Sequence, residues 1–225
     1  MRGLLFTGGS RPDMSLATRF FGKYDAVYAA DSGLLGAQEA GIEVNYVVGD
    51  MDSIPNLSVL ENFDNKQIIR SPRDKDLTDT ELALILMREQ DISEIVLIGG
   101  DGGRMDHFFA LYRMFSLKKP PIIWIGSDTI AFTLEAETNH ESIVVTDLDC
   151  EAAVSIFPVG SAENNDLSHG HICVADGLYW PVNNLLWDGG QFSLSNRAPT
   201  GTCKIEAVAG RFLVVLPLIG GYSLS

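Results

Sequence analysis

The spacing of hydrophobic and polar positions changes about halfway along the chain. Up to about residue 125, short apolar runs alternate with stretches in which apolar residues recur at helical spacing. The runs predict strands over residues 4–7, 26–29, 46–48, 67–69, 94–98 and 122–125, and the stretches predict helices over 15–23, 34–40, 80–90 and 106–117. This alternation indicates a parallel sheet with helices, which binds ligands beyond the carboxyl ends of its strands.

After about residue 126 the helical spacing disappears and short apolar runs follow one another between turn residues. They predict strands over residues 142–145, 153–157, 171–174, 191–194, 204–208 and 212–216. Regular short strands are typical of an antiparallel β-sandwich or barrel. We therefore expect a Rossmann-like α/β domain over residues 1–130 and a β-sandwich or barrel domain over 131–225, with a boundary between 126 and 140.

Composition and charge narrow the function classes. The 225 residues are 46% hydrophobic and 20% charged, as in an ordinary globular protein, and the formal net charge is -14. Such a charge disfavours binding to nucleic acid or anionic membranes, so an enzyme of this kind that handles phosphates must recruit a cation or concentrate its few basic residues. Three widely separated cysteines predict neither a disulfide framework nor a zinc site. The short N-terminal apolar run lacks a cleavage pattern, so we expect a cytoplasmic protein.

Two carboxylates follow the third predicted strand, Asp50 and Asp52. In an extended chain, side chains two residues apart project from the same side, so the pair could hold a hard cation with oxygen ligands. An Asp-rich turn explains the spacing equally well.

A denser acidic cluster precedes the helix predicted over 80–90. Thr78 and Glu81 fit a capping box, and Asp79 falls in the first helical turn, where an acid complements the helix dipole. Capping does not explain the upstream Asp74-Lys75-Asp76, although mixed charges in a loop are usually just solvated. A magnesium and phosphate site needs this mixture, because carboxylates hold the metal while a basic side chain answers the phosphate charge.

Two further turns follow predicted strands. The glycine-rich turn over residues 99–103 would let backbone amides approach an anion, and Arg104 adds a planar donor fork, but the P-loop ending is missing and the glycines could serve packing alone. Asp31 could either cap the next helix or hydrogen-bond a ligand. Because four such turns end strands of one predicted sheet, their convergence indicates a phosphate and metal site.

These motifs, taken in order, resemble the thiamine pyrophosphokinase family. The resemblance spans nearly the whole chain and rests on Ala30-Asp31-Ser32-Gly33, Gly49-Asp50-Met51-Asp52-Ser53-Ile54, Asp74-Lys75-Asp76-Leu77-Thr78-Asp79, Gly102-Gly103-Arg104-Met105-Asp106-His107, Ser155-Ile156-Phe157-Pro158, Gly177-Leu178-Tyr179-Trp180-Pro181-Val182 and Ser193-Leu194-Ser195-Asn196. It implies a magnesium-dependent transfer of the diphosphate of ATP to the hydroxyl of thiamine, giving thiamine diphosphate and AMP.

The resemblance also implies roles for individual residues. Asp50, Asp52 and Asp79 match the metal-binding carboxylates. The nucleotide and phosphate loops contain Asp31, Ser32, Lys75, Asp76, Thr78, Arg104 and Asp106. The residues that match the thiamine-binding part are Ser193, Ser195 and Asn196. Asp79 or Asp76 could accept the proton of the attacking hydroxyl.

The family forms homodimers whose active site combines the α/β domain of one subunit with the β domain of the other. The resemblance thus assigns catalysis to residues 1–130 and thiamine binding to 131–225. Ser32 replaces a glycine that is common in the family. Family members often have an aromatic residue just after the Ser-Asn pair, where it stacks on thiamine, but Arg197 occupies this position here. Trp180, Trp187 or Phe192 could take over the stacking. Two alternatives stay open: a diphosphokinase acting on another heterocyclic alcohol, of the pterin type, and a non-catalytic nucleotide- or thiamine-binding regulator.

Overall fold

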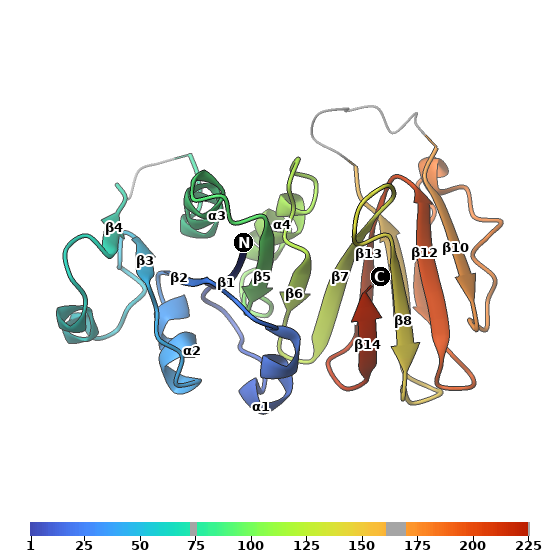
Figure 1. The fold of residues 1–225 in the computed structure, drawn as a ribbon, viewed down its shortest axis with the longest axis horizontal. Helices are drawn as coiled ribbons and strands as arrows, with labels where there is room; N and C mark the ends of the chain where they lie inside the picture. The colour runs from blue at the N-terminus through green and yellow to red at the C-terminus, as the bar shows by residue number, and fades with distance from the viewer. Residues whose placement is uncertain (73–75, 161–169, 225) are drawn as a thin grey trace. The chain divides into compact units, whose positions relative to one another are not determined.

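The computed structural model describes residues 1–72, 76–160 and 170–224, and the chain divides into two compact units (Figure 1). The first contains Met1–Met114 and Trp124–Ser127, and the second contains Phe115–Ile123 and Asp128–Ser225. The single border expected at residue 130 is thus replaced by three crossings of the chain between units. Among the described residues, no helix is both long and apolar enough to span a membrane.

The first unit is built on a mostly parallel sheet, as the strand and helix alternation predicts. Its strands run in the order β6-β5-β1-β2-β3-β4, and the five from β5 to β4 pair in parallel. They are β1 (Arg2–Phe6), β2 (Ala26–Ala30), β3 (Tyr46–Gly49), β4 (Ile68–Arg70), β5 (Glu94–Ile98) and β6 (Ile123–Ile125). Continuous burial along β1, β2 and β5 explains their uninterrupted apolar sequences.

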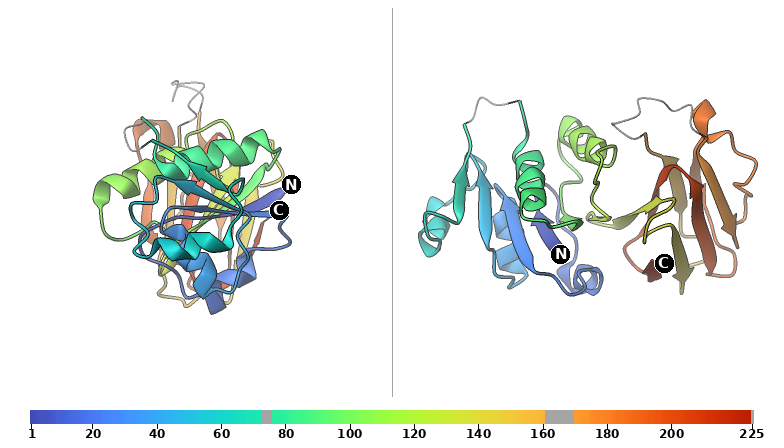
Figure 2. Two further views of the ribbon diagram at one scale, coloured as in Figure 1. Left: turned by 90° about the vertical axis from the view of Figure 1, so that its left-hand side faces the viewer. Right: turned by 45° about the horizontal axis from the view of Figure 1, so that its top comes forward.

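Helices cover both faces of this sheet, with α3 and α4 on one and α1 and α2 on the other (Figure 2). The helical segments are α1 (Met14–Ala17), η1 (Thr18–Phe20), α2 (Gly33–Glu39), η2 (Leu57–Asn62), α3 (Asp79–Glu89) and α4 (Met105–Met114). The helix expected over 15–23 is wrong in length, because α1 and η1 end before Gly22, which has a φ of 62°. The predicted capping box of α3 is confirmed, with Glu81 and Thr78 bonded reciprocally.

The second unit contains eight antiparallel strands within its described residues. They lie in the orders β11-β9-β13-β7 and β10-β12-β8-β14, and Phe132 and Tyr222 connect these two sets with ring centroids 5.5 Å apart. The strands are β7 (Thr129–Glu135), β8 (Ser142–Thr146), β9 (Val154–Pro158), β10 (Ile172–Asp176), β11 (Ser193–Asn196), β12 (Cys203–Ala209), β13 (Arg211–Pro217) and β14 (Gly221–Leu224). The antiparallel pairing is as predicted, whereas β7 and β14 were not expected.

Candidate active site

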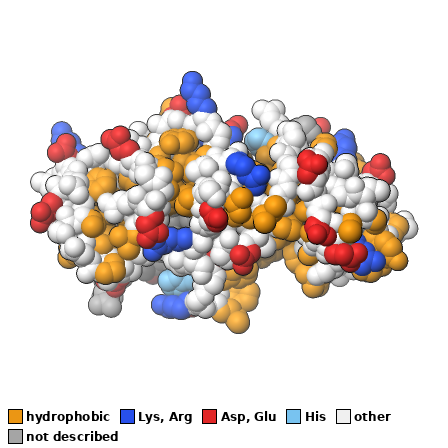
Figure 3. Space-filling model, turned by 90° about the horizontal axis from the view of Figure 1, so that it is seen from below, with side chains coloured by type: hydrophobic (Ala, Val, Ile, Leu, Met, Phe, Trp, Pro, Cys, Tyr) orange, Lys and Arg blue, Asp and Glu red, His pale blue; other side chains and the backbone are white. Residues whose placement is uncertain are grey.

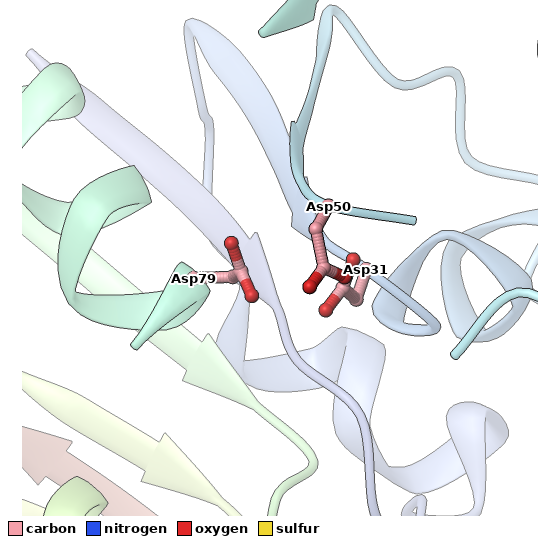
Figure 4. A group of neighbouring side chains, drawn as sticks. All are labelled: Asp31, Asp50 and Asp79. Atoms are coloured by element: carbon pink, nitrogen blue, oxygen red, sulfur yellow. The ribbon is translucent and has the colours of Figure 1, made fainter. Parts of the chain in front are cut away.

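Three carboxylates converge at the carboxyl-terminal edge of the sheet in the first unit (Figure 4). Asp31 follows β2, Asp50 follows β3, and Asp79 opens α3. Each offers one oxygen, and these three oxygens lie within 4.8 Å of one another. All three residues are half-buried, so their charges are only partly screened by water. Carboxylate oxygens in this arrangement suit a hard divalent cation such as Mg²⁺.

The backbone at the end of β3 lets the carboxylates approach closely. Gly49, at a φ of 145°, directs its missing side chain toward them, and a Cβ there would collide with Asp31 Oδ1 and lie 3.2 Å from Asp79 Cγ. The Met51 N–H donates to Asp31 Oδ1 at 3.0 Å, and the Ser71 hydroxyl donates to Asp79 Oδ1 at 2.9 Å. Glycine at position 49 therefore lets Asp31 and Asp79 lie close to the end of β3, because a side chain at this position would displace them.

Burial and the neighbouring negative charges raise the pKa of Asp31 to about 7. Burial is the largest cause, followed by the charge of Asp79 and opposed by the hydrogen bond from the Met51 N–H. A hydrogen bond with Asp79 and the charge of Asp50 raise this pKa further. The group thus binds a proton near neutral pH, and a divalent cation would answer the same excess of charge.

Asp52 does not share the geometry expected from its spacing to Asp50. Met51 has a φ of 66°, so the chain turns instead of extending, and the Asp52 N–H donates to Asp50 Oδ1 at 3.0 Å. The expectation that both carboxylates project from one side of an extended chain is therefore wrong. Among the described residues, Asp31 completes the group of three, and metal binding by Asp52 stays a prediction.

A pocket of about 210 Å³ opens beside the start of α3. Its lining comprises Thr7, Gly8, Gly9, Thr78, Thr80, Gly100, Gly102, Gly103, Arg104, His107, Ala110 and Leu111. Thr78 and Thr80 thus border the pocket on either side of Asp79 in the sequence, and the buried Thr80 hydroxyl lies 2.7 Å from that of Thr7. Two glycine-rich turns and Arg104 therefore line a pocket that also includes the neighbours of Asp79 in the sequence. Backbone amides of such turns and a guanidinium are groups that suit phosphate.

Arg104 is already paired with an exposed carboxylate at the start of α4. Its Nε and one terminal nitrogen donate to the two oxygens of Asp106, at 3.1 and 2.5 Å. This hydrogen bonding lowers the pKa of Asp106 to about 2. Both side chains are solvent-exposed, so Arg104 can exchange this partner for a phosphate at little cost.

Comparison with known proteins ties this geometry to a family. Residues 17–123, which include all three carboxylates, match the family model for the catalytic domain of thiamin pyrophosphokinase. The resemblance to thiamine pyrophosphokinases is confirmed. No curated protein matches the chain.

The fold is also similar to crystal structures of thiamine pyrophosphokinases. The enzyme from Bacillus subtilis superposes with a TM-score of 0.72 at 19% identity, covering 96% of this chain and 99% of that chain. The protein from Geobacillus thermodenitrificans superposes with a TM-score of 0.67 at 21% identity, covering 96% of this chain and 97% of that chain. The protein from Candida albicans superposes with a TM-score of 0.64 at 17% identity, covering 96% of this chain and 89% of that chain. At these identities the likeness shows the fold alone.

The other residues assigned to the nucleotide and phosphate loops by the family resemblance do not gather in one place among the described residues. Ser32 is the N-cap residue just before α2, and its N–H donates to Ser53 Oγ at 3.3 Å. Asp31 does not cap this helix, so the capping alternative for it is wrong. Asp76 is exposed and lies outside the group of three carboxylates. Lys75 lies outside the described residues, together with Asp74. Nucleotide binding by these residues stays a prediction.

The residues that match the thiamine-binding part lie on β11 in the second unit. Asn196 is buried, and its amide donates to the Trp180 carbonyl at 2.8 Å and to Ser193 Oγ at 3.2 Å. Its oxygen accepts from the N–H groups of Trp180 and Arg197, at 3.1 and 2.9 Å. Asn196 therefore joins β11 to the segment at Trp180, while Ser195 remains exposed and accessible to a ligand.

The aromatic candidates for stacking on thiamine separate by exposure. Trp187 is buried against Phe212, so it belongs to the core of the second unit. Trp180 and Phe192 are 51% and 52% exposed. Arg197 lies over the ring of Tyr179, with its guanidinium carbon 4.2 Å from the ring centroid.

Sequence reasoning missed the first turn of the site and two polar residues. Gly8 and Gly9 line the pocket directly after β1, although the sequence there passes from an apolar strand into glycines just as the other turns do. Ser71 bonds Asp79, and Asp101 bonds the backbone of neighbouring turns. The repeated strand-to-glycine pattern could have identified the first turn, but nothing in the sequence singles out Ser71.

Proposed function

We propose that this protein is a thiamine pyrophosphokinase, which transfers the diphosphate of ATP to the hydroxyl of thiamine and releases AMP. The observation that carries the proposal is the group of Asp31, Asp50 and Asp79 beside a glycine-lined pocket, within the residues that match the catalytic domain. Mg²⁺ held by these three carboxylates would supply positive charge against the phosphates of ATP.

The chain's own groups account for the remaining requirements of the reaction. Amides of the glycine turns and the Arg104 guanidinium would orient the phosphates in the pocket. The thiamine hydroxyl oxygen forms a bond to the β-phosphorus as the bond from that phosphorus to the α–β bridging oxygen breaks, leaving AMP. The hydroxyl proton passes to a carboxylate, for which Asp79 is better placed than Asp76, since it lies in the group of three.

Thiamine is the acceptor in this proposal because the chain suits a cation. The net charge is -14, and thiamine carries a permanent positive charge on its thiazolium ring. The accessible Ser195 on β11 would contact it, in a homodimer whose sites combine the first unit of one subunit with the second unit of the other. Lys and Arg side chains are scattered among acidic ones on the described surface shown in Figure 3, which favours small substrates over nucleic acid. We place the enzyme in the cytoplasm.

A second candidate acceptor is a pterin-type alcohol. The Arg197 guanidinium already covers the face of Tyr179, a face on which the cationic ring of thiamine could otherwise stack, and this favours an acceptor without that charge. Incubation with ATP and Mg²⁺ should give AMP with thiamine and none with a hydroxymethylpterin. AMP from the pterin alone would transfer the activity to the second acceptor. Binding of ATP and thiamine without AMP from either acceptor would indicate a regulator instead of an enzyme.

A further inference from the structure

Asp101 connects three turns at one end of the sheet in the first unit. Its Oδ2 accepts hydrogen bonds from the backbone N–H and the hydroxyl of Ser127, both at 2.7 Å. Its carbonyl oxygen accepts from the Ser10 N–H at 2.8 Å, which joins the turn after β1 to the turn after β5. Ser127 is the last residue of the first unit before the chain enters the second.

Close contacts leave little freedom around these bonds. A Cβ at Gly126 would lie 2.6 Å from Asp101 Oδ2, and a Cβ at Gly9 would lie 3.0 Å from Gly100 Cα and 3.1 Å from the Asp101 carbonyl oxygen. The turns therefore pack backbone against backbone, and small displacements of one must shift the others. Only glycine allows this approach at position 9, whereas a methyl group at position 126 would press on the Asp101 carboxylate.

Asp101 itself does not line the pocket, but its neighbours do. Gly9 lies on one side of the Ser10–Asp101 bridge, and Gly100 and Gly102 flank Asp101. One buried carboxylate oxygen, Oδ1, has no hydrogen-bond partner among the described residues. Burying an oxygen without a partner costs free energy of folding. A carboxylate at position 101 is therefore not explained by stability alone, and its two bonds to Ser127 suggest a role in holding the turns.

We propose that Asp101 is a positioning residue for the nucleotide phosphates. It fixes the glycine turns after β1 and β5 at the spacing at which their amides can contact the phosphates together, while contacting no substrate itself. This inference rests on the proposed function, because it takes the pocket to be the phosphate site. Loss of the Ser127 bonds should loosen both turns and weaken nucleotide binding, with little effect on thiamine.

The test compares Asp101→Leu, which lacks acceptors, with Asp101→Asn, which keeps one for Ser127. Calorimetric titration of the full chain with a non-hydrolysable ATP analogue and Mg²⁺ should show about tenfold weaker binding for the Leu variant and less than about twofold for the Asn variant. In turnover, KM for ATP should rise in the Leu variant while KM for thiamine stays unchanged. A merely structural role would lower the folded fraction and kcat without this split.

Gly126→Ala supplies an independent variant should Asp101→Leu fold poorly. Its methyl group would displace the Asp101 carboxylate without replacing any residue of the two glycine turns, so it should reproduce the rise in KM for ATP. Ser127→Ala, which keeps the backbone donor, should have a smaller effect of the same kind. Unchanged analogue affinity in Asp101→Leu and Gly126→Ala would overturn the Asp101 proposal alone. A wild-type protein that fails to bind the analogue would instead remove the proposed function and, with it, this inference.

Discussion

The acidic group of the first unit and the polar residues of β11 in the second differ in how completely other groups of the protein balance their charge or form their hydrogen bonds. The like charges of Asp31, Asp50 and Asp79 lie close together, beside a glycine whose missing side chain lets Asp31 approach. Asn196, by contrast, uses its amide and its oxygen in four hydrogen bonds, two within its own segment and two to the backbone of Trp180. A family motif can therefore contain either residues that bind a ligand or residues that support the backbone around it. The two are distinguished by how completely the side chains already have hydrogen-bond partners or balanced charge within the chain.

The largest effect should come from removing a charge at the acidic group. Asp50→Asn or Asp79→Asn should lower kcat for AMP formation on the order of 10²- to 10³-fold, because each variant weakens the hold on a cation at the phosphates. The melting temperature should stay near that of the wild type, since both residues lie at element ends and lose a like-charge repulsion.

Asp52→Asn is the matched control for these variants, since Asp52 lies outside the group of three. It should retain far more activity than Asp50→Asn. Wild-type turnover in Asp50→Asn, or equal losses in both, would remove the distinction between the two carboxylates.

In the second unit the largest effect should be on stability. Asn196→Ala removes a buried side chain that bonds the backbone of Trp180 and of Arg197, so the free energy of unfolding should fall by about 2–4 kcal/mol. Urea unfolding followed by circular dichroism measures this change. Ser195→Ala, at an exposed neighbour, should leave stability unchanged and raise KM for thiamine. An Asn196→Ala protein of normal stability would contradict the structural role given to Asn196.

The pH dependence of stability should reveal the strain in the acidic group. The pKa of Asp31 is raised to about 7, above its value of about 4 in an unfolded chain. Asp31 therefore contributes stability that is complete below about pH 4 and is lost as the pH rises through about 7. Without metal, its contribution should be on the order of 1–2 kcal/mol smaller at pH 8 than at pH 5, after allowance for solvent screening.

Urea titrations at the two pH values should show this difference in the wild type and not in Asp31→Asn, whose neutral amide can still accept from Met51. Adding Mg²⁺ at pH 8 should restore stability to the wild type more than to the variant. Parallel pH profiles for the two proteins would mean that Asp31 titrates normally.

The smallest effect should come from Arg197. Its guanidinium is partly exposed over Tyr179, so Arg197→Ala should cost about 0.5–1 kcal/mol of stability. If the arginine occupies a face that a cationic acceptor needs, the variant should also lower KM for thiamine, measured by AMP formation. Arg197→Lys keeps the charge without the planar fork and serves as the control. A higher KM for thiamine in Arg197→Ala would show that the arginine helps the acceptor to bind.

Local sequence determines much of the fold and part of the site. The strand over 94–98 and the capping box at Thr78 were predicted as observed, because short-range periodicity and a cap motif define them. The membership of Asp31 in the acidic group was not, since it depends on the adjacent carboxyl ends of β2 and β3 and on the turn at Met51. The same holds for Asp101, whose partners lie far along the chain at Ser10 and Ser127.

The missed strands have a different cause. β7 follows the last crossing between units, in a stretch where the sequence shows the change of rhythm but no clear border. β14 has four residues, of which Leu224 and Tyr222 are the large apolar ones, so no run stands out. Both strands are defined by the antiparallel partners β13 and β8, which pair with them over several residues. Such pairing is a tertiary property that a local pattern does not contain.

The raised pKa of Asp31 also makes metal binding and proton binding competitors for one group of oxygens. A protein that holds this proton near neutral pH must release it when a cation enters, up to about one proton per cation. Magnesium affinity should consequently rise with pH up to about 8 and then level off. A modest fall in pH would then lower the fraction of protein with bound metal without any change in magnesium concentration. Protons and Mg²⁺ would thus control the occupancy of the site together.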